Sequence, residues 1–160
     1  MPKKSERELY GLNEYGFSDD NSVIICDLDG TLAINDHGRD YFDATDCDKD
    51  SVNIPVLTVL RLAVNDDRGI IFVSGREERF RAPTLKFLSR YLLDDFPLFM
   101  RNDGDNRGDV VIKKEIYEEH IEDKYNILFV FDDRNSDKCP VVDMWREQGL
   151  TCFQVADGNF

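Results

Sequence analysis

The chain has 160 residues, of which 41% are hydrophobic and 33% are charged, so we expect one globular domain whose core needs no disulfide bonds. The formal net charge of −13 argues against a broad surface that coats nucleic acid, although a small basic pocket is compatible with it. No apolar run is long enough to span a membrane, the N-terminus lacks a signal-peptide core, and the four cysteines form no CxxC pair. A reducing compartment, the cytoplasm, is therefore expected.

Short apolar runs alternate with segments of helical periodicity after a polar N-terminal arm at residues 1–21. The runs are continuous, which is typical of strands buried on both faces, and cover residues 23–26, 70–73, 98–100, 127–131 and 152–155. Apolar residues at helical spacing predict a helix in each gap: after Pro55, at Leu85–Leu92, at Ile112–Ile121 and at Val141–Trp145. This alternation predicts βαβ units and a mostly parallel sheet within one domain, residues 22–160.

Polar residues follow three of the predicted strands, and the carboxyl ends of parallel strands form the ligand-binding edge of such a sheet. A single Asp after a strand is commonly a turn or cap residue. Four carboxylates at one edge repel one another and need a cation, and they are Asp27, Asp29, Asp132 and Asp133. Hard oxygen ligands favour Mg²⁺, which in turn favours a phosphate held by donors such as Ser74, Arg76 and a lysine.

The spacing of the first two carboxylates indicates phosphoryl transfer. A carboxylate at Asp27 can attack phosphorus and form an aspartyl phosphate. A second carboxyl two residues later can protonate the leaving oxygen and then activate water, and Gly30 permits the tight turn between them. The sequence contains no GxxxxGK[ST] motif, so ATP binding by a P-loop is not supported.

These residues resemble the four motifs of the haloacid-dehalogenase (HAD) phosphohydrolase superfamily. Motif I is Asp27-Leu28-Asp29-Gly30-Thr31, and motifs II to IV are Ser74, Lys113 and Asp132-Asp133. More specifically, residues 23–160 resemble the 3′-phosphatase domain of bacteriophage polynucleotide kinase–3′-phosphatase, through segments 29–33, 73–77, 113–116, 132–134, 144–146 and 154–160. The resemblance implies a HAD-like Rossmannoid three-layer α/β sandwich. Its parallel sheet would have five strands in the order 5-4-1-2-3, with only a small cap or flap.

The resemblance also implies roles for the matched residues. Asp27 would be the nucleophile and a metal ligand, and Asp29 the general acid/base with its backbone carbonyl on the metal. Asp132 and Asp133 would complete a magnesium site. The substrate phosphate would be bound by Thr31, Arg39, Ser74, Gly75, Arg76 and Lys113, and Asp109 would support the site.

Several readings stay open at this point. Lys114 follows Lys113, and we favour Lys113 because the ungapped match places it in motif III. Asp109 either caps the helix that begins near Val110 or orients a basic side chain.

The histidines are expected to be structural or exposed, and Trp145 is expected to pack in the core. The loop of residues 32–54 is long enough for a small flap, and its Tyr41 and Phe42 lie where they would contact a nucleotide end.

The resemblance therefore implies a magnesium-dependent polynucleotide 3′-phosphatase of nucleic-acid end repair, acting on 3′-phosphorylated DNA or RNA ends. Because the sequence carries no kinase motif, a separate kinase or ligase is an expected partner, and a bacteriophage origin would place the protein in the host cytoplasm. The alternatives are a HAD phosphatase of free nucleotides or other small phosphate esters, and a binding module with a vestigial site. Competent residues at every catalytic position of the four motifs argue against the vestigial site.

Overall fold

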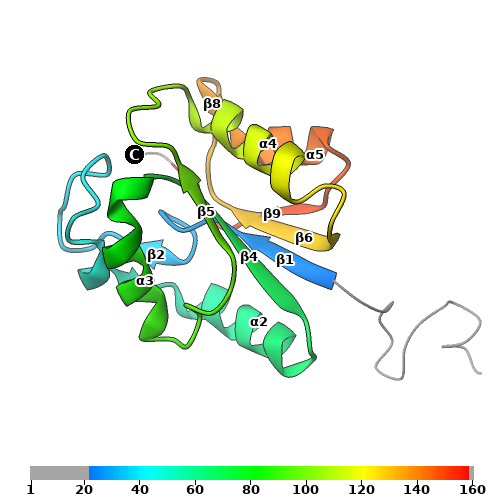
Figure 1. Ribbon diagram of the computed structural model, residues 1–160, viewed down its shortest axis with the longest axis horizontal. Coiled ribbons are helices and arrows are strands. Elements are labelled where there is room, and N and C mark those ends of the chain that lie inside the picture. The colour runs from blue at the N-terminus through cyan, green and yellow to red at the C-terminus, as the bar shows by residue number, and fades with distance from the viewer. Residues whose placement is uncertain (1–21, 159–160) are drawn as a thin grey trace, which may run out of the picture.

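The computed structural model describes residues 22–158, so the expected arm at residues 1–21 lies outside the described residues. A parallel sheet of five strands lies at the centre, in the order β5-β4-β1-β6-β9 (Figure 1). Counted along the chain from the β9 edge, this order is 5-4-1-2-3, and the predicted topology is confirmed. The strands are β1 (Ser22–Cys26), β4 (Gly69–Glu77), β5 (Leu98–Arg101), β6 (Asn126–Asp132) and β9 (Cys152–Gln154).

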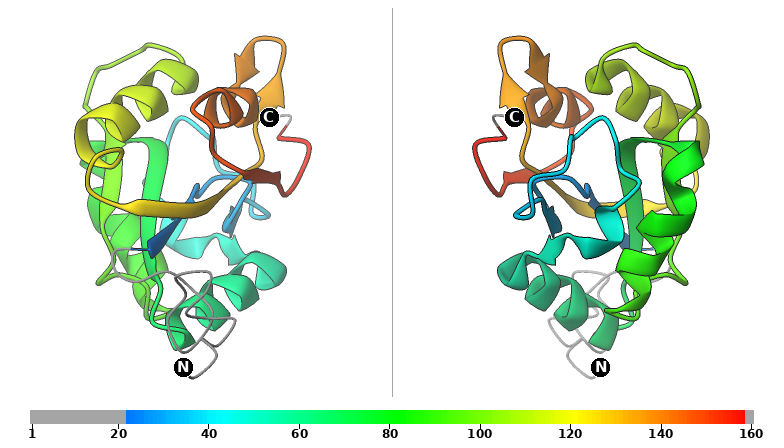
Figure 2. Two further views of the ribbon diagram at one scale, coloured as in Figure 1. Left: turned by 90° about the vertical axis from the view of Figure 1, so that its right-hand side faces the viewer. Right: turned by 90° about the vertical axis from the view of Figure 1, so that its left-hand side faces the viewer.

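Four α-helices cover the two faces of the sheet, two on each face (Figures 1 and 2). They are α2 (Ile54–Asn65) and α3 (Arg81–Ser89) on one side, and α4 (Asp109–His120) and α5 (Val141–Glu147) on the other. The described residues thus form the expected three-layer α/β sandwich. The predicted second helix was too long, because α3 ends at Ser89 and Leu92 lies in a turn with φ 59° and 83% exposure.

The core is divided by the sheet into two apolar clusters. Ile24 and Cys26 of β1 pack in the cluster beneath α2 and α3, whereas Val23 and Ile25 pack in the cluster beneath α4 and α5. Successive side chains of a strand point to opposite faces, so a strand that is covered on both sides must be apolar at every position. Full burial of one such side chain contributes about 1.5–3 kcal/mol. This explains the continuous apolar runs of the sequence.

Short elements complete the fold around the carboxyl edge of the sheet. The antiparallel pair β2 (Ala33–Ile34) and β3 (Ser51–Val52) closes a flap over residues 35–50, which contains the 3-10 helix η1 (Cys47–Lys49). A second 3-10 helix, η2 (Glu78–Phe80), precedes α3, and β7 (Asn135–Ser136) pairs with β8 (Cys139–Pro140). The sequence did not predict these pairs. Within residues 22–158 no helix combines the length and apolarity that a membrane crossing requires.

Candidate active site

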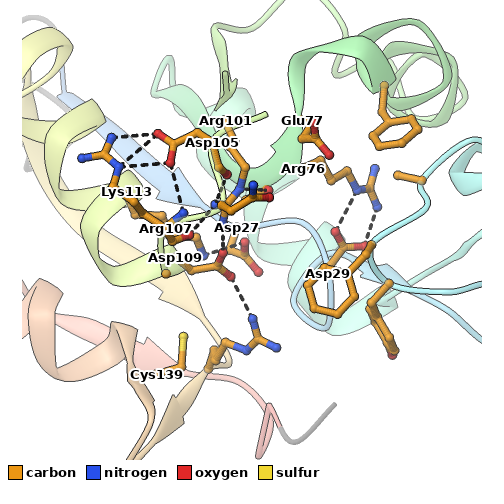
Figure 3. Close-up of a pocket in the computed structure, with 18 of the residues that line it drawn as sticks. Asp27, Asp29, Arg76, Glu77, Arg101, Asp105, Arg107, Asp109, Lys113 and Cys139 are labelled. Carbon is orange, nitrogen blue, oxygen red and sulfur yellow. Dashed lines mark hydrogen bonds and ion pairs between the residues drawn. The ribbon is translucent and has the colours of Figure 1, made fainter. Parts of the chain in front are cut away.

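A pocket of about 510 Å³ opens at the carboxyl ends of β1, β4 and β6 (Figure 3). This volume falls within the roughly 300–1,000 Å³ that small-ligand sites occupy. The remaining walls come from the flap, η2, the end of β5 with the segment that follows it, α4, and the segment after β6 up to β8. Acidic, basic and aromatic side chains share the lining, and they include Asp27, Asp29, Asp133, Arg39, Arg76, Arg101, Arg107, Arg134, Lys113, Tyr41, Phe42 and Phe80.

A tight turn after β1 fixes the first two carboxylates. The carbonyl of Leu28 accepts hydrogen bonds from the backbone N–H groups three, four and five residues later, at 3.1, 3.0 and 2.8 Å. Gly30 has φ 82°, a conformation that glycine adopts without a Cβ penalty. Asp27 consequently remains buried in line with β1, and Asp29 turns toward the flap.

Three buried carboxylates gather at the inner end of the pocket. Each of Asp27, Asp132 and Asp133 offers an oxygen that lies within 4.8 Å of the others. Lys113 reaches this cluster from α4, and its Nζ donates to Asp27 Oδ1 at 2.8 Å and to Asp132 Oδ2 at 2.7 Å. One ammonium group thus faces three carboxylates, and the cluster keeps an excess of negative charge.

The pKa values of the cluster reflect this excess. Burial raises the pKa of Asp27 well above its ordinary value, an effect that Lys113 opposes and Asp132 reinforces. Burial and then the charge of Asp132 raise the pKa of Asp133 to about 6. Burial alone would lower the pKa of Lys113, but the neighbouring carboxylates raise it, so the ammonium stays charged. Asp133 Oδ2 is buried without a hydrogen-bond partner. Such a donor set fits a divalent cation with oxygen ligands.

Asp29 lies apart from this cluster and is held by two arginines. Arg76 donates from Nε to Asp29 Oδ2 at 2.8 Å and from Nη2 to Oδ1 at 2.7 Å (Figure 3). Arg39 Nη2 donates to Asp29 Oδ1 at 2.5 Å. Burial would raise the pKa of Asp29, but the charges and hydrogen bonds of Arg76 and Arg39 outweigh it and lower that pKa. The expected crowding of four carboxylates therefore applies to three, because arginines balance the charge of Asp29.

Asp50 lies behind both arginines and is fully buried. Its Oδ1 accepts hydrogen bonds from Arg39 Nε and from His37 Nε2, each at 2.9 Å. Its Oδ2 accepts from Arg39 Nη2 at 2.7 Å and from Arg76 Nη2 at 3.1 Å. Charge-assisted bonds of this kind fix the orientation of a planar guanidinium group. Asp50 therefore holds both arginines in place beside Asp29.

Asp109 forms a third charged group on the other side of Asp27 (Figure 3). Its carboxylate makes an ion pair with Arg101 and accepts a hydrogen bond from Arg134 Nη1 at 2.9 Å. The cap position of α4 is Gly108, and no side-chain hydrogen bond caps this helix. The capping interpretation of Asp109 is therefore wrong, and the residue orients basic side chains of the pocket.

Comparison with known proteins identifies the family. The model of the polynucleotide kinase PNKP phosphatase domain matches residues 21–160. The chain belongs to this family. The "Putative bifunctional polynucleotide kinase/RNA ligase" of Autographa californica nuclear polyhedrosis virus is 34% identical over 137 residues, which cover 83% of this chain and 19% of that protein.

Solved structures agree with this assignment. A chain of the Pnkp1/Rnl/Hen1 complex is 46% identical with a TM-score of 0.81, and the match covers 88% of this chain and 47% of that one. The class C acid phosphatase of Bacillus anthracis, at 16% identity, TM-score 0.60 and 88% and 70% coverage, shares the fold. The chain thus spans less than half the length of its polynucleotide kinase relatives. As a member of the PNKP phosphatase family, it is a HAD-type phosphoric monoester hydrolase.

The family motifs occupy the pocket and the layer behind it. The residues expected from the sequence that line the pocket are Asp27, Asp29, Arg39, Gly75, Arg76, Asp109, Lys113 and Asp133. Behind them, Asp132 accepts from Lys113, and Ser74 Oγ accepts the backbone N–H of Arg76 at 3.2 Å. The buried Thr31 hydroxyl donates to Asp133 Oδ1 at 3.1 Å. Lys114 is half exposed and lies 3.7 Å from Glu118, so Lys113 is the lysine that enters the site.

Sequence reasoning missed several charged residues of the site, which include Arg101, Arg107, Arg134 and Asp50. Arg101 ends the third strand of the sheet, and reading the residues that follow this strand as well would have found it. Arg134 directly follows motif IV, and the motif assigns no role to this position. Asp50 and His37 lie among many polar residues of the flap, and no local pattern distinguishes them. The expectation that His37 is structural or exposed is confirmed, because the residue is exposed and bonds to Asp50.

Proposed function

We propose that this chain hydrolyses the 3′-terminal phosphate of DNA or RNA ends, in a magnesium-dependent reaction that passes through an aspartyl phosphate on Asp27. The observation that carries the proposal is the cluster of Asp27, Asp132 and Asp133 with Lys113 at the inner end of an arginine-lined pocket. The PNKP phosphatase family, and the RNA repair complex that contains a 46% identical relative, support a polynucleotide end as substrate.

The carboxylate cluster suits a divalent metal ion. Asp27, Asp132 and Asp133 would hold Mg²⁺ through carboxylate oxygens, and the motif I resemblance adds the backbone carbonyl of Asp29. The buried, unpartnered Oδ2 of Asp133 supports this assignment. When bound, Mg²⁺ would neutralise the carboxylates and withdraw negative charge from the phosphoryl group. The Thr31 hydroxyl, expected on the phosphate, is assigned instead to the support of Asp133.

In the first half of the reaction, a carboxylate oxygen of Asp27 attacks phosphorus, and the bond between phosphorus and the 3′ oxygen breaks. The electron pair stays on the 3′ oxygen, which takes a proton from the carboxyl group of Asp29. Lys113 Nζ, 2.8 Å from Asp27 Oδ1, is placed to contact the phosphoryl oxygens. Arg76 and Arg39 lower the pKa of Asp29. While Asp50 keeps both side chains in place, the incoming phosphate would share their N–H groups, weaken their hold on Asp29 and allow it to take up a proton from solvent.

In the second half, water attacks the phosphorus of the aspartyl phosphate. The carboxylate of Asp29 accepts a proton from this water, and the bond between phosphorus and the Asp27 oxygen breaks. Orthophosphate leaves, and the Asp27 carboxylate is regenerated. The proton on Asp29 then passes to solvent, and Arg39 and Arg76 again pair with its carboxylate as they do in the structure.

The proposed function is accompanied by proposals for the domains, the partner and the compartment of this chain. We assign residues 22–160 to the phosphatase domain and residues 1–21 to an N-terminal arm. The names of the relatives, a polynucleotide kinase/RNA ligase and an RNA repair complex, support a kinase or ligase as a partner of this chain. All four cysteines are free, which supports a reducing compartment such as the cytoplasm.

The direct test measures phosphate release from an oligonucleotide with a 3′-phosphate, with and without Mg²⁺, beside the same strand with a 5′-phosphate. We expect release from the 3′ end alone, only with Mg²⁺. Asp27→Asn removes the nucleophile and should reduce the rate by at least about a thousand-fold. Asp123→Asn, at an exposed position away from the pocket, is the matched control and should leave the rate unchanged.

Two outcomes would contradict the proposal. Hydrolysis of nucleoside monophosphates or other small esters, with the oligonucleotide left intact, would replace it with a metabolite phosphatase. Equal release from the 3′ and 5′ ends would contradict the proposed specificity for the 3′ end, while the assignment as a phosphatase would remain.

A further inference from the structure

An exposed aromatic side chain stands at the mouth of the pocket. Phe42 is 86% exposed, the largest fraction among the large hydrophobic residues that the structure describes. It lines the pocket together with its neighbour Tyr41. An isolated apolar side chain on a surface needs no explanation, but one at the rim of an active site marks a ligand contact.

The loop that carries Phe42 is tied to the catalytic residues. Asp40 Oδ1 accepts the backbone N–H of Phe42 at 2.8 Å, which fixes the turn at the tip of the flap. Asn35 accepts the backbone N–H of Arg39 at 3.1 Å and donates to its carbonyl at 2.6 Å. The guanidinium of Arg39 then bonds to Asp29 and lies 5.7 Å from the ring centre of Tyr41. The aromatic pair is thus held two and three residues from an arginine of the site.

The charges around the mouth limit what this aromatic pair would bind. Asp40 and Asp43 flank the aromatic pair in the sequence, so a phosphate group is disfavoured beside the exposed Phe42 ring, whereas the guanidinium of Arg39 lies on the inner side of the pair, against Tyr41 and Asp29. The basic side chains Arg101 and Arg134 lie elsewhere in the lining, beside Asp109. A nucleobase is uncharged and has an apolar face, so it is accepted where a phosphate is not. Stacking of bases on aromatic side chains is also tolerant of sequence.

We propose that Phe42, supported by Tyr41, is a stacking platform for the nucleobase at the 3′ end of the substrate strand. This inference rests on the proposed function, because the terminal phosphate must lie at Asp27 and Lys113 for its nucleotide to project from the mouth. The platform would select a nucleotide end over a simple phosphate ester. It would also bind through contacts that salt does not screen, which suits a chain with a net charge of −13.

The test compares Phe42→Ala and Phe42→Trp on a 3′-phosphorylated oligonucleotide with Mg²⁺. We expect Phe42→Ala to raise KM by about 5- to 150-fold with kcat nearly unchanged, and Phe42→Trp to keep the KM of the unmodified chain. A second substrate has an abasic sugar at its 3′ end, and its KM should be equal for Phe42→Ala and the unmodified chain. Leu62→Ala, at a 63% exposed apolar position on α2 outside the pocket, is the matched control.

The outcomes separate this inference from the proposed function. If the unmodified chain releases 3′-phosphate and Phe42→Ala has an unchanged KM on the normal strand, the proposed stacking role of Phe42 is wrong. The proposed 3′-phosphatase function is then still supported. An equal rise in KM on the normal and abasic strands would likewise overturn base stacking, and would point to a disturbed flap. If the unmodified chain leaves every oligonucleotide intact, both proposals fall.

Discussion

An unpartnered carboxylate oxygen at Asp133 makes the metal-free protein sensitive to pH. The pKa of Asp133 is about 6 in the folded chain, against about 3.9 for an unfolded Asp. The folded state therefore binds more protons between these values. The raised pKa of Asp133 therefore stabilises the folded state below about pH 4, and this stabilisation is lost as pH rises through about 6. Above that pH, the charged group depends on a cation.

We therefore expect Mg²⁺ to raise the Tm more at neutral pH than at about pH 5, where the ion must displace a proton. Thermal unfolding with Mg²⁺ or with a chelator, at both pH values, measures this difference. Asp133→Asn should raise the Tm of the metal-free protein at neutral pH and remove most of the response to Mg²⁺. An equal response at both pH values would contradict the assignment of Asp133 as a ligand.

Trp145 links the core to the carboxylate cluster. It is fully buried, and its Nε1 donates to Asp132 Oδ2 at 3.1 Å. Trp145→Phe keeps the apolar body and removes this bond to a charged group, so the free energy of unfolding should fall by about 1.5–3 kcal/mol. Urea unfolding measures the change. A loss below about 0.5 kcal/mol would show that the bond adds nothing to stability.

At the scale of elements, the segment after β9 completes the active-site edge. Val155 donates its backbone N–H to Asp132 O at 3.0 Å, and Gln154 Nε2 donates to Asp133 O at 3.2 Å. Gly158, with φ 63°, lies so close that a Cβ would stand 2.5 Å from Asp133 O. The tail that follows β9 thus determines the position of the segment after β6.

Gly158→Ala tests this contact. A Cβ there must displace backbone atoms of the metal-site segment, so we expect phosphatase activity to fall by about ten-fold or more while the circular dichroism spectrum is retained. Gly149→Ala is the control, because Gly149 has φ 79° and open space around its missing Cβ. Gly149→Ala has the same strain of a side chain at positive φ, about 1–2 kcal/mol, without the clash. Equal losses of activity in the two variants would show that strain alone is responsible.

At the scale of the whole molecule, we expect the net charge of −13 to confine contacts with the proposed polynucleotide substrate to the pocket. We expect the kcat/KM for a single-stranded substrate to depend weakly on salt, with a log–log slope of about −1.4, equivalent to two phosphates. The measurement is turnover across a series of NaCl concentrations, corrected by the salt response of a small phosphate ester. A slope near −4 would show a long basic track and overturn this expectation.

The architecture followed from patterns in the sequence. Continuous apolar runs separated by helical periodicity predicted the parallel sheet, because strands covered on both faces are apolar along most of their length and carry polar residues only near their ends. The strand order came from the resemblance of motif I and the segments around Ser74 and Asp132. The short pairs β2–β3 and β7–β8 had no such pattern, since two-residue strands are too short to show periodicity.

The sequence by itself predicted that carboxylates gather at one edge of the sheet, since Asp27, Asp132 and Asp133 stand at the ends of parallel strands, but it also placed Asp29 among them. Only the tertiary structure decided how their neighbours are paired. Asp50 and Arg39 come from the flap and meet Arg76 of β4 around Asp29, a charge network between segments that no local spacing encodes. The placement of Arg101 and Arg134 on Asp109 depends in the same way on packing, because the two arginines come from β5 and from the segment after β6, and the fold brings both to the start of α4.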